Sequence, residues 1–169
     1  HEVLGLTLLD HVLRATSELN SQKTLVIVGH GKEQVQEHLA LGYPEVMAAV
    51  QDEQNGTGHA VKIALDAIGD LDGSVLVLAG DTPLLTSADM QLALDALNGK
   101  AAAVLTAELS DPTGYGRIVR NAQDDFEKIV EHRDASTAEL SITEVNSGVY
   151  AFDAKLLRES LAKLTTDNS

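Results

Sequence analysis

The chain of 169 residues carries 12 Lys and Arg against 26 Asp and Glu, a formal net charge of −14. This charge disfavours binding to nucleic acid or to an anionic membrane surface, and a phosphate site here needs a divalent cation, backbone amides or clustered Lys and Arg. Hydrophobic residues make up 44% of the chain and aromatic residues 3%, a globular composition that excludes a disordered chain.

The length favours one domain with a sizeable core. The chain has no cysteine, which excludes disulfides and cysteine-based zinc sites and favours a cytoplasmic protein. Its apolar runs are short and interrupted by charges, so neither a membrane span nor a secretory signal is predicted. The sequence contains no HExxH or G-x-S-x-G motif, which argues against a helical zinc site and the simplest serine hydrolase.

Helices and strands alternate along the first half of the chain. Apolar residues at three- and four-residue spacings predict helices, and short apolar runs between them predict buried strands. The predicted helices span 8–19, 32–41 and 58–68, and the predicted strands span 25–28, 46–50 and 75–79. Because these strands show no inside/outside alternation, they favour a parallel sheet covered by helices on both faces.

The alternation of helices and strands changes after a helix predicted at 87–97. Strands are predicted at 103–109, 116–120, 126–131 and 145–152 with few helices between them, which indicates a partly antiparallel second half. The expected fold is therefore α/β, with three layers and a doubly wound, mixed, mainly parallel sheet. An α/β unit normally opens with a strand, whereas this chain opens almost directly into a helix. We therefore expect a first strand to be missing.

Ligands of open α/β sheets bind beyond the carboxyl ends of the strands, so the residues that follow each strand are the first candidates. Gly29-His30-Gly31-Lys32 fits neither a dinucleotide fingerprint nor a P-loop and is interpreted as a strand-to-helix turn. Asp81 follows the strand at 75–79 within Gly80-Asp81-Thr82-Pro83. Its carboxylate is either a magnesium ligand or a turn aspartate that bonds its own backbone.

A third candidate, the segment at 51–58, leads into the predicted helix that begins at Gly58. Thr57 is interpreted as the cap of that helix. The amide of Gln51 offers a donor and an acceptor side by side, which suits the edge of a base such as uracil.

Later polar segments are individually typical of turns and strand ends. Taken together, they can line a pocket, because Gly116 leaves room for a ring while Glu131 and Asn146 suit sugar hydroxyls and an amide.

These segments together resemble one family. Asp-Pro-Thr-Gly-Tyr-Gly-Arg-Ile-Val at 111–119 and Glu-Val-Asn-Ser-Gly at 144–148 are its most specific motifs in this chain. The other similar segments are 26–31, 51–60, 77–85 and 129–135. The chain resembles, over essentially its whole length, the uridyltransferase domain of bacterial bifunctional N-acetylglucosamine-1-phosphate uridyltransferase/glucosamine-1-phosphate acetyltransferases.

The resemblance implies a role for each candidate residue. The positions that match the nucleotide-binding segments are Gln51, Gly56, Thr57, Ala79, Gly80 and Asp81. Asp81 also matches the ligand of a catalytic Mg²⁺. The positions that match contacts to the N-acetylglucosamine moiety are Gly116, Glu131 and Asn146. Two departures are mild: Ala79 stands where the family often has Tyr, and Ser147 where Thr is usual.

The implied reaction joins UTP and N-acetylglucosamine 1-phosphate into UDP-N-acetylglucosamine, a cell-envelope precursor, with release of pyrophosphate. Two alternatives stay open. The chain could be a pyrophosphorylase for another sugar 1-phosphate, or a non-catalytic module that binds a nucleotide sugar.

The serious departures are at the ends. The family begins with a strand, a Gly-x-Gly-Thr-Arg-Met loop and a Pro-Lys-Val-Leu-His segment, of which His1 matches only the last residue. Beyond 164–169 it continues to an asparagine metal ligand and to a trimer-forming acetyltransferase domain. We therefore expect residues 1–169 to be a single partial domain, monomeric alone, with unpaired sheet edges and no turnover.

Overall fold

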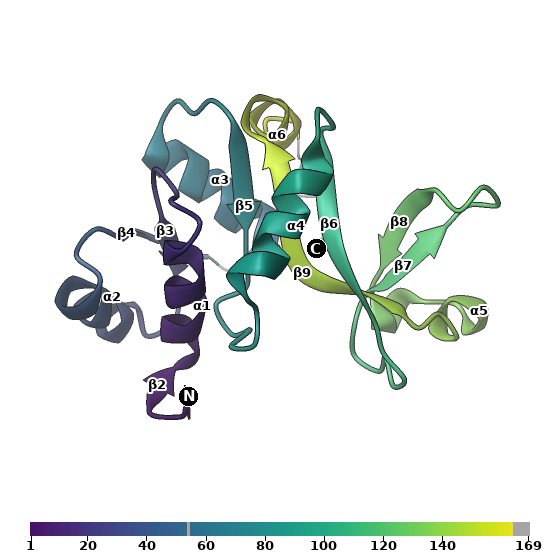
Figure 1. Ribbon diagram of the computed structural model, residues 1–169, viewed down its shortest axis with the longest axis horizontal. Coiled ribbons are helices and arrows are strands. Elements are labelled where there is room, and N and C mark those ends of the chain that lie inside the picture. Colours follow the sequence, from purple (N-terminus) through teal and green to yellow (C-terminus); the bar gives the residue numbers. More distant parts are fainter. Residues whose placement is uncertain (54, 164–169) are drawn as a thin grey trace.

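The computed structural model describes residues 1–53 and 55–163 (Figure 1). The strands are β1 (Glu2–Val3), β2 (Leu6–Thr7), β3 (Leu25–Val28), β4 (Met47–Val50), β5 (Ser74–Val77), β6 (Ala102–Glu108), β7 (Arg117–Arg120), β8 (Phe126–Val130) and β9 (Glu144–Asp153). The helices are α1 (Leu8–Ser17), α2 (Lys32–Gly42), α3 (Gly56–Ile68), α4 (Ser87–Leu97), α5 (Thr137–Leu140) and α6 (Ala154–Leu161), with a 3₁₀ turn, η1, at His132–Asp134.

All the predicted helices and strands are present, with ends shifted by at most two residues. The largest shift at a helix start is in α3, which begins at Gly56 and places Asn55 at the N-cap position with no side-chain cap bond. The prediction that Thr57 caps this helix is therefore wrong, because Thr57 already lies inside its first turn. The small hairpin of β1 and β2, the turn η1 and helices α5 and α6 were not predicted.

The longest strand, β9, organises the larger sheet. It pairs antiparallel with β5, β6 and β7, and β8 extends the sheet beyond β7. This arrangement confirms the expected antiparallel character of the second half. Figure 1 shows the β7–β8 hairpin, with α5 next to it, at the side of the molecule opposite β3 and β4.

Helices cover both faces of this sheet. On β5, Val75 packs with Leu65 of α3 and Leu157 of α6, whereas its neighbour Leu76 packs with Ala93 of α4. Successive side chains of a strand point to opposite faces, so α4 lies on one face and α3 and α6 on the other. The predicted α/β class with three layers is confirmed.

The parallel pairing lies in a separate ladder. β3 and β4 run parallel from Leu25↔Met47 to Val28↔Val50, and α2 and α3 pack against them. Within the described residues, no strand pairing joins this ladder to β5. Among the described residues, the two-stranded sheet of β3 and β4 is therefore parallel, and the five-stranded sheet is antiparallel.

In the ranges 1–53 and 55–163, no helix is long and apolar enough to cross a bilayer. The predicted approach to a second metal ligand, at 164–169, lies outside the described residues.

Candidate functional site

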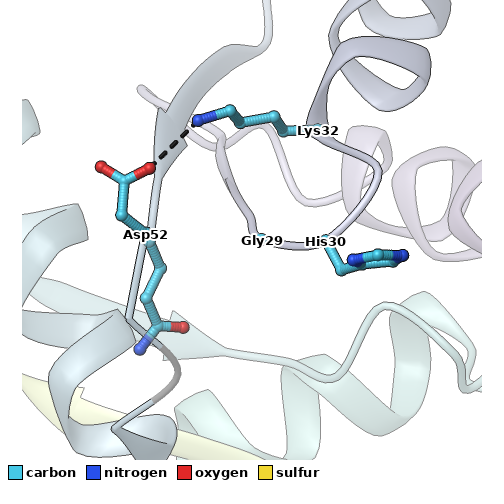
Figure 2. A pocket seen from close by; sticks show the side chains of 5 residues that line it. Gly29, His30, Lys32 and Asp52 are labelled. Carbon is cyan, nitrogen blue, oxygen red and sulfur yellow. Dashed lines mark hydrogen bonds and ion pairs between the residues drawn. The ribbon is translucent and has the colours of Figure 1, made fainter.

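A cavity of about 440 Å³ lies at the carboxyl ends of β3 and β4 (Figure 2). Its lining residues are Gly29, His30, Lys32, Gln51 and Asp52. Because β3 and β4 are parallel and in register, the residues that follow both strands meet at one edge of the sheet. The volume falls within the usual range for small-ligand sites.

An ion pair links the loops that follow β3 and β4. Lys32 Nζ lies 3.0 Å from Asp52 Oδ1, and Figure 2 shows the two side chains reaching toward each other. The hydrogen bond to Asp52 raises the pKa of Lys32. Gly31 makes the turn before Lys32 possible, because it adopts a left-handed conformation with φ +69° that glycine tolerates readily.

The structure joins two of the residues predicted to bind the nucleotide. The backbone N–H of Gln51 donates to Val28 O at 2.8 Å, which fixes Gln51 at the end of the ladder. Its side-chain amide donates to Gly56 O at 3.3 Å and lies 3.1 Å from His59 Nδ1. Thr57 is exposed on the first turn of α3.

The turn after β5 presents an exposed carboxylate. The side-chain hydrogen bond of this turn comes from Thr82, whose Oγ1 donates to Ala79 O at 3.0 Å, and not from Asp81. Gly80 is an exposed residue of this turn and lies near α1, since a Cβ there would be 3.6 Å from Leu9 Cδ1. The carboxylate of Asp81 is therefore accessible to a ligand.

Asp81 fits a magnesium ion that is shared with a substrate. Within the described residues, no group of three or more His, Asp and Glu side chains is arranged to hold a metal alone. Mg²⁺ usually keeps several waters and takes one or two protein carboxylates together with substrate phosphates. A single accessible carboxylate at the end of a strand meets that requirement.

The three residues predicted to contact the sugar lie together. A Cβ added to Gly116 would be 3.3 Å from Glu131 Oε1, and the backbone N–H of Asn146 donates to Gly116 O at 2.9 Å. The β7–β8 hairpin brings Gly116 next to Glu131, and the pairing of β7 with β9 adds Asn146. The three residues are therefore neighbours, while the pocket that they were predicted to line and its ligand stay predictions.

Asn146 stands at an irregularity of β9. Its Oδ1 accepts from the N–H of Gly148 at 3.0 Å, and its Nδ2 donates to the hydroxyl of Tyr150 at 2.6 Å. The register against β6 shifts here, where Thr106 pairs with Asn146 and the preceding residue, Leu105, pairs with Val149. Gly148 has φ +79°, a conformation that allows the chain to bulge.

The ladder of β5 and β9 connects this group to Asp81. Val77 is the last paired residue of β5 and faces Tyr150. Asp81 lies four residues beyond Val77, and Asn146 lies four residues before Tyr150. In an antiparallel pair these positions leave the ladder at the same end, so both residues belong to one edge of the sheet. No hydrogen bond between described residues joins Asp81 to the Gln51 segment.

A buried arginine connects the segments that carry two of the residues predicted to contact the sugar. Arg117 is 1% exposed, and its guanidinium donates to Tyr115 O and to His132 Nδ1, the latter at 3.3 Å. These contacts connect the loop before Gly116 to the turn after Glu131. Within the described part of the chain, Arg117 Nε has no hydrogen-bond partner.

The sequence reasoning missed several residues of these groups. Lys32 was assigned to a turn, and the contacts of His59 and Arg117 were not foreseen. Lys32 follows a strand as Asp81 does, so the same rule could have selected it. The roles of His59 and Arg117 depend on side-chain directions that no spacing reveals.

Comparison with known proteins supplies a family and several relatives. The family model described as "Nucleotidyl transferase" matches residues 2–169. The bifunctional protein GlmU of Streptomyces coelicolor is 50% identical over 173 residues, covering 100% of this chain and 36% of that protein. GlmU of Streptomyces avermitilis is likewise 50% identical over 173 residues, with 36% of its length covered. The chain thus spans about a third of the length of these curated relatives.

A solved structure supports the fold. A putative glucose-1-phosphate thymidylyltransferase from Bacillus anthracis superposes with a TM-score of 0.78 at 19% identity, covering 98% of this chain and 65% of that chain. At this identity the likeness concerns the fold alone.

Proposed function

Because the chain belongs to the nucleotidyl transferase family, we propose that it carries most of a site for transfer of a uridylyl group from UTP to N-acetylglucosamine 1-phosphate. The products are UDP-N-acetylglucosamine, a precursor of the cell envelope, and pyrophosphate. The observation that supports the proposal is that Asp81 and Asn146 lie beyond the same end of the β5–β9 pairing, and that Gly116 and Glu131 adjoin Asn146. The absence of cysteine is in keeping with a cytoplasmic enzyme.

The two groups of residues divide the substrates between them. Gln51 and the backbone at Gly56 hold the base of UTP beside the cavity at the ends of β3 and β4. Glu131 and Asn146 bind the sugar hydroxyls and the acetamido group, and Gly116, because it has no side chain, lets Glu131 and Ile129 approach its backbone. A phosphate oxygen of the sugar substrate then attacks the α-phosphorus of UTP, and pyrophosphate leaves. Holding the two reacting atoms in line is the main contribution of the protein to the rate.

Nucleotidyl transferases commonly use a divalent metal, and we propose Mg²⁺ with Asp81 as its protein ligand in this chain. The ion, when bound, neutralises phosphate charge that develops as pyrophosphate departs. The carboxylate of Asp81 orients the triphosphate through this shared contact. The site needs this positive charge, because the chain carries a formal net charge of −14 and Lys32 is already paired with Asp52.

Substitution of Asp81 tests this proposal. Pyrophosphate release from UTP and N-acetylglucosamine 1-phosphate is measured with Mg²⁺ in this chain and in a version extended at both ends. We expect turnover in the extended protein, and we expect Asp81→Asn to reduce kcat about 100-fold or more because an electrostatic contact to the reacting phosphates is lost. The free energy of unfolding should change by less than about 0.5 kcal/mol, because Asp81 is exposed.

Asp70→Asn is the matched control, because Asp70 is exposed beyond the end of α3. It should leave kcat unchanged. An Asp81→Asn enzyme with full activity at saturating Mg²⁺ would refute the assignment of the metal ligand. Equal turnover of the chain with and without its extensions would instead refute the expectation that 1–169 is a partial domain.

Competition between sugar phosphates tests the acceptor. N-acetylglucosamine 1-phosphate should be preferred over glucose 1-phosphate, and Asn146→Ala should reduce that preference while the KM for UTP stays constant. A preference that does not depend on Asn146 would contradict the role of Asn146, whereas a wild type that prefers another sugar 1-phosphate would favour a pyrophosphorylase for that sugar.

A further inference from the structure

The side-chain amide of Gln51 has a fixed orientation in this structure, and a histidine contributes to it. We propose that His59 is a positioning residue that holds the amide of Gln51 with its oxygen free, so that the site selects a base with a ring N–H, such as uracil, over cytosine. This inference rests on the proposed function, because it assumes that Gln51 reads the base.

The carbonyl of Gly56 determines which atom of the Gln51 amide is the nitrogen and which is the oxygen. A carbonyl oxygen only accepts hydrogen bonds, so the group of Gln51 that lies 3.3 Å from Gly56 O must be the amide nitrogen. The same nitrogen lies 3.1 Å from His59 Nδ1. Its second N–H therefore points at the imidazole, and His59 Nδ1 must accept.

The surroundings of His59 agree with this assignment. His59 Nδ1 also lies 3.2 Å from Glu53 O, a contact that is a hydrogen bond only if Nδ1 carries the proton. A proton there would face the N–H of Gln51 and would cost that contact. Glu53 O already accepts from the backbone N–H of Asn55 at 2.9 Å, so it needs no second donor. The arrangement that gives both N–H groups of Gln51 an acceptor places the proton of His59 on Nε2.

The locked amide has a consequence for base selection. Both N–H groups of Gln51 are occupied by Gly56 O and His59 Nδ1, so Oε1 is the amide atom left for a ligand of the cavity that Gln51 lines. An oxygen accepts from N3–H of uracil, whereas N3 of cytosine is itself an acceptor and is repelled. Without His59, only the longer bond to Gly56 O at 3.3 Å would oppose rotation of the amide, and this discrimination would fall.

The protonation of His59 can be measured without any ligand. Nitrogen-15 NMR of the imidazole in this chain should show the proton of neutral His59 on Nε2 and a bare Nδ1. A neutral ring protonated on Nδ1 would overturn the proposed role of His59, because its Nδ1 could then not accept from the amide of Gln51.

Base preference is the second measurement. The dissociation constants of UTP and CTP with Mg²⁺ are compared by calorimetry for the wild type and for His59→Phe, which keeps a ring but removes the acceptor. We expect the preference for UTP to fall about five- to tenfold, the effect of one hydrogen bond between neutral groups. His59→Asn should retain most of the preference, because its Oδ1 occupies the place of Nδ1 and accepts in the same way.

Two further variants separate positioning from a general structural effect. In a Gln51→Leu background, His59→Phe should change the preference no further, because there is no amide left to orient. His11→Phe is the matched control, since His11 bonds only Val3 O in the described residues, and it should leave the preference unchanged.

The outcomes distinguish the inference from the proposed function. Loss of preference in Gln51→Leu with full preference in His59→Phe overturns the role of His59 and leaves the proposed function standing. A wild type that does not prefer UTP, or a Gln51→Leu variant that keeps the preference, contradicts the assignment of Gln51 to the base. Additive effects of the two substitutions also overturn the positioning role.

Discussion

Among the three residues predicted to contact the sugar, Gly116 is the one at which space matters most. Its backbone φ is unremarkable for an L-residue, so its value lies in the missing side chain. A Cβ there would lie 3.1 Å from Ile129 Cγ2 and 3.3 Å from Glu131 Oε1, closer than ordinary van der Waals contact. The hairpin has no slack on the Ile129 side, because Ile118 pairs with Ile129 and is buried.

Gly116→Ala is therefore expected to displace Glu131. The KM for the sugar phosphate should rise at least about tenfold with little change in the KM for UTP, and the free energy of unfolding should fall by about 1–3 kcal/mol from overpacking. Steady-state kinetics with each substrate varied in turn, together with denaturant unfolding, measures both effects.

Gly42→Ala is the control for that substitution. A Cβ at Gly42 would meet nothing within 4 Å, and its φ lies outside the left-handed region. Kinetics and stability should match the wild type. A Gly116→Ala enzyme with an unchanged KM for the sugar phosphate would contradict the placement of the sugar beside Glu131.

The sequence predicted the residues of the site better than their connections. Asp81 was found because it follows a strand, and Asn146 because its motif is specific to the family. The role of Arg117 was not found, because a buried arginine cannot be told from an exposed one by position on a short strand. The prediction for Gln51 was half complete, since the donor and acceptor of its amide were foreseen and the use of both N–H groups by the protein was not.

At the scale of elements, two helices begin with the same motif in different surroundings. Thr7 and Asp10 form a reciprocal capping box at α1, and Thr86 and Asp89 form one at α4. Asp10 is buried and also binds His38 of α2 at 2.7 Å, so it joins two helices. Asp89 has only its cap contacts to Thr86 among the described residues.

Asp10→Asn should therefore cost more stability than Asp89→Asn. We expect a loss of about 2–3 kcal/mol for Asp10→Asn, because a buried, charge-assisted contact is lost together with the cap, and about 1 kcal/mol for Asp89→Asn. Chemical denaturation at neutral pH gives both values. Equal losses would show that the contact with His38 adds nothing.

The same carboxylate makes stability depend on pH. Burial opposes the ionisation of Asp10, but hydrogen bonds from Thr7, His38 and Tyr43 outweigh it and hold the pKa of Asp10 well below its ordinary value of 3.8. A carboxyl with a lowered pKa stabilises the fold above its unfolded pKa and loses this contribution as the pH falls toward its folded pKa.

The difference in unfolding free energy between wild type and Asp10→Asn should be constant from about pH 5 to pH 8 and should shrink below about pH 4. Denaturant titrations across that range measure it. A difference that grew as the solution became more acidic would contradict the direction of the pKa change.

The ends of elements were harder to predict than their existence. The apolar spacing of α3 starts at Ala60, so it could not show that the helix backbone already begins at Gly56. The hairpin of β1 and β2 was missed because two-residue strands are too short to show alternation. Its turn places Leu4 at φ +53° beside Gly5. A positive φ is uncommon for a leucine, and nothing in the sequence predicts it.

At the scale of the whole molecule, the two ladders differ in how many neighbouring strands stabilise them. β9 pairs with β6 along most of its length, with β5 toward its C-terminal end and with β7 at Val145, and it contributes the buried residues Val145, Val149 and Ala151 to the core. Within the described residues, β3 pairs only with β4, and β4 only with β3. The two-stranded sheet of β3 and β4 is therefore stabilised by the packing of α2 and α3 rather than by further paired strands.

Amide hydrogen exchange should reveal this difference. Peptides from β9 are expected to exchange most slowly, and peptides from β3 and β4 should exchange at least about tenfold faster under native conditions, because opening there breaks one ladder only. Mass spectrometry of the chain after timed labelling measures both regions in one sample. Equal protection of β3 and β9 would show that the two ladders open as one unit.

The sequence predicted the layers correctly and the strand directions only in part. β5 is apolar on both faces because α4 covers one face and α3 and α6 cover the other. That burial predicted a parallel neighbour, which holds for β3 with β4, whereas β5 pairs antiparallel with β9. Apolar faces report which helices cover a strand, and the direction of its partner depends on contacts far apart in the sequence.

The bulge in β9 makes chain length, more than residue identity, the property to preserve between Asn146 and Val149. Ser147 helps hold it, since its hydroxyl donates to Leu105 O at 2.6 Å. Substitution of Ser147 alters that contact, but deletion of a single residue would turn Asn146 to the opposite face of the sheet relative to Tyr150 and everything beyond it. A random library at position 147 should therefore yield active substituted clones and none that are one codon shorter.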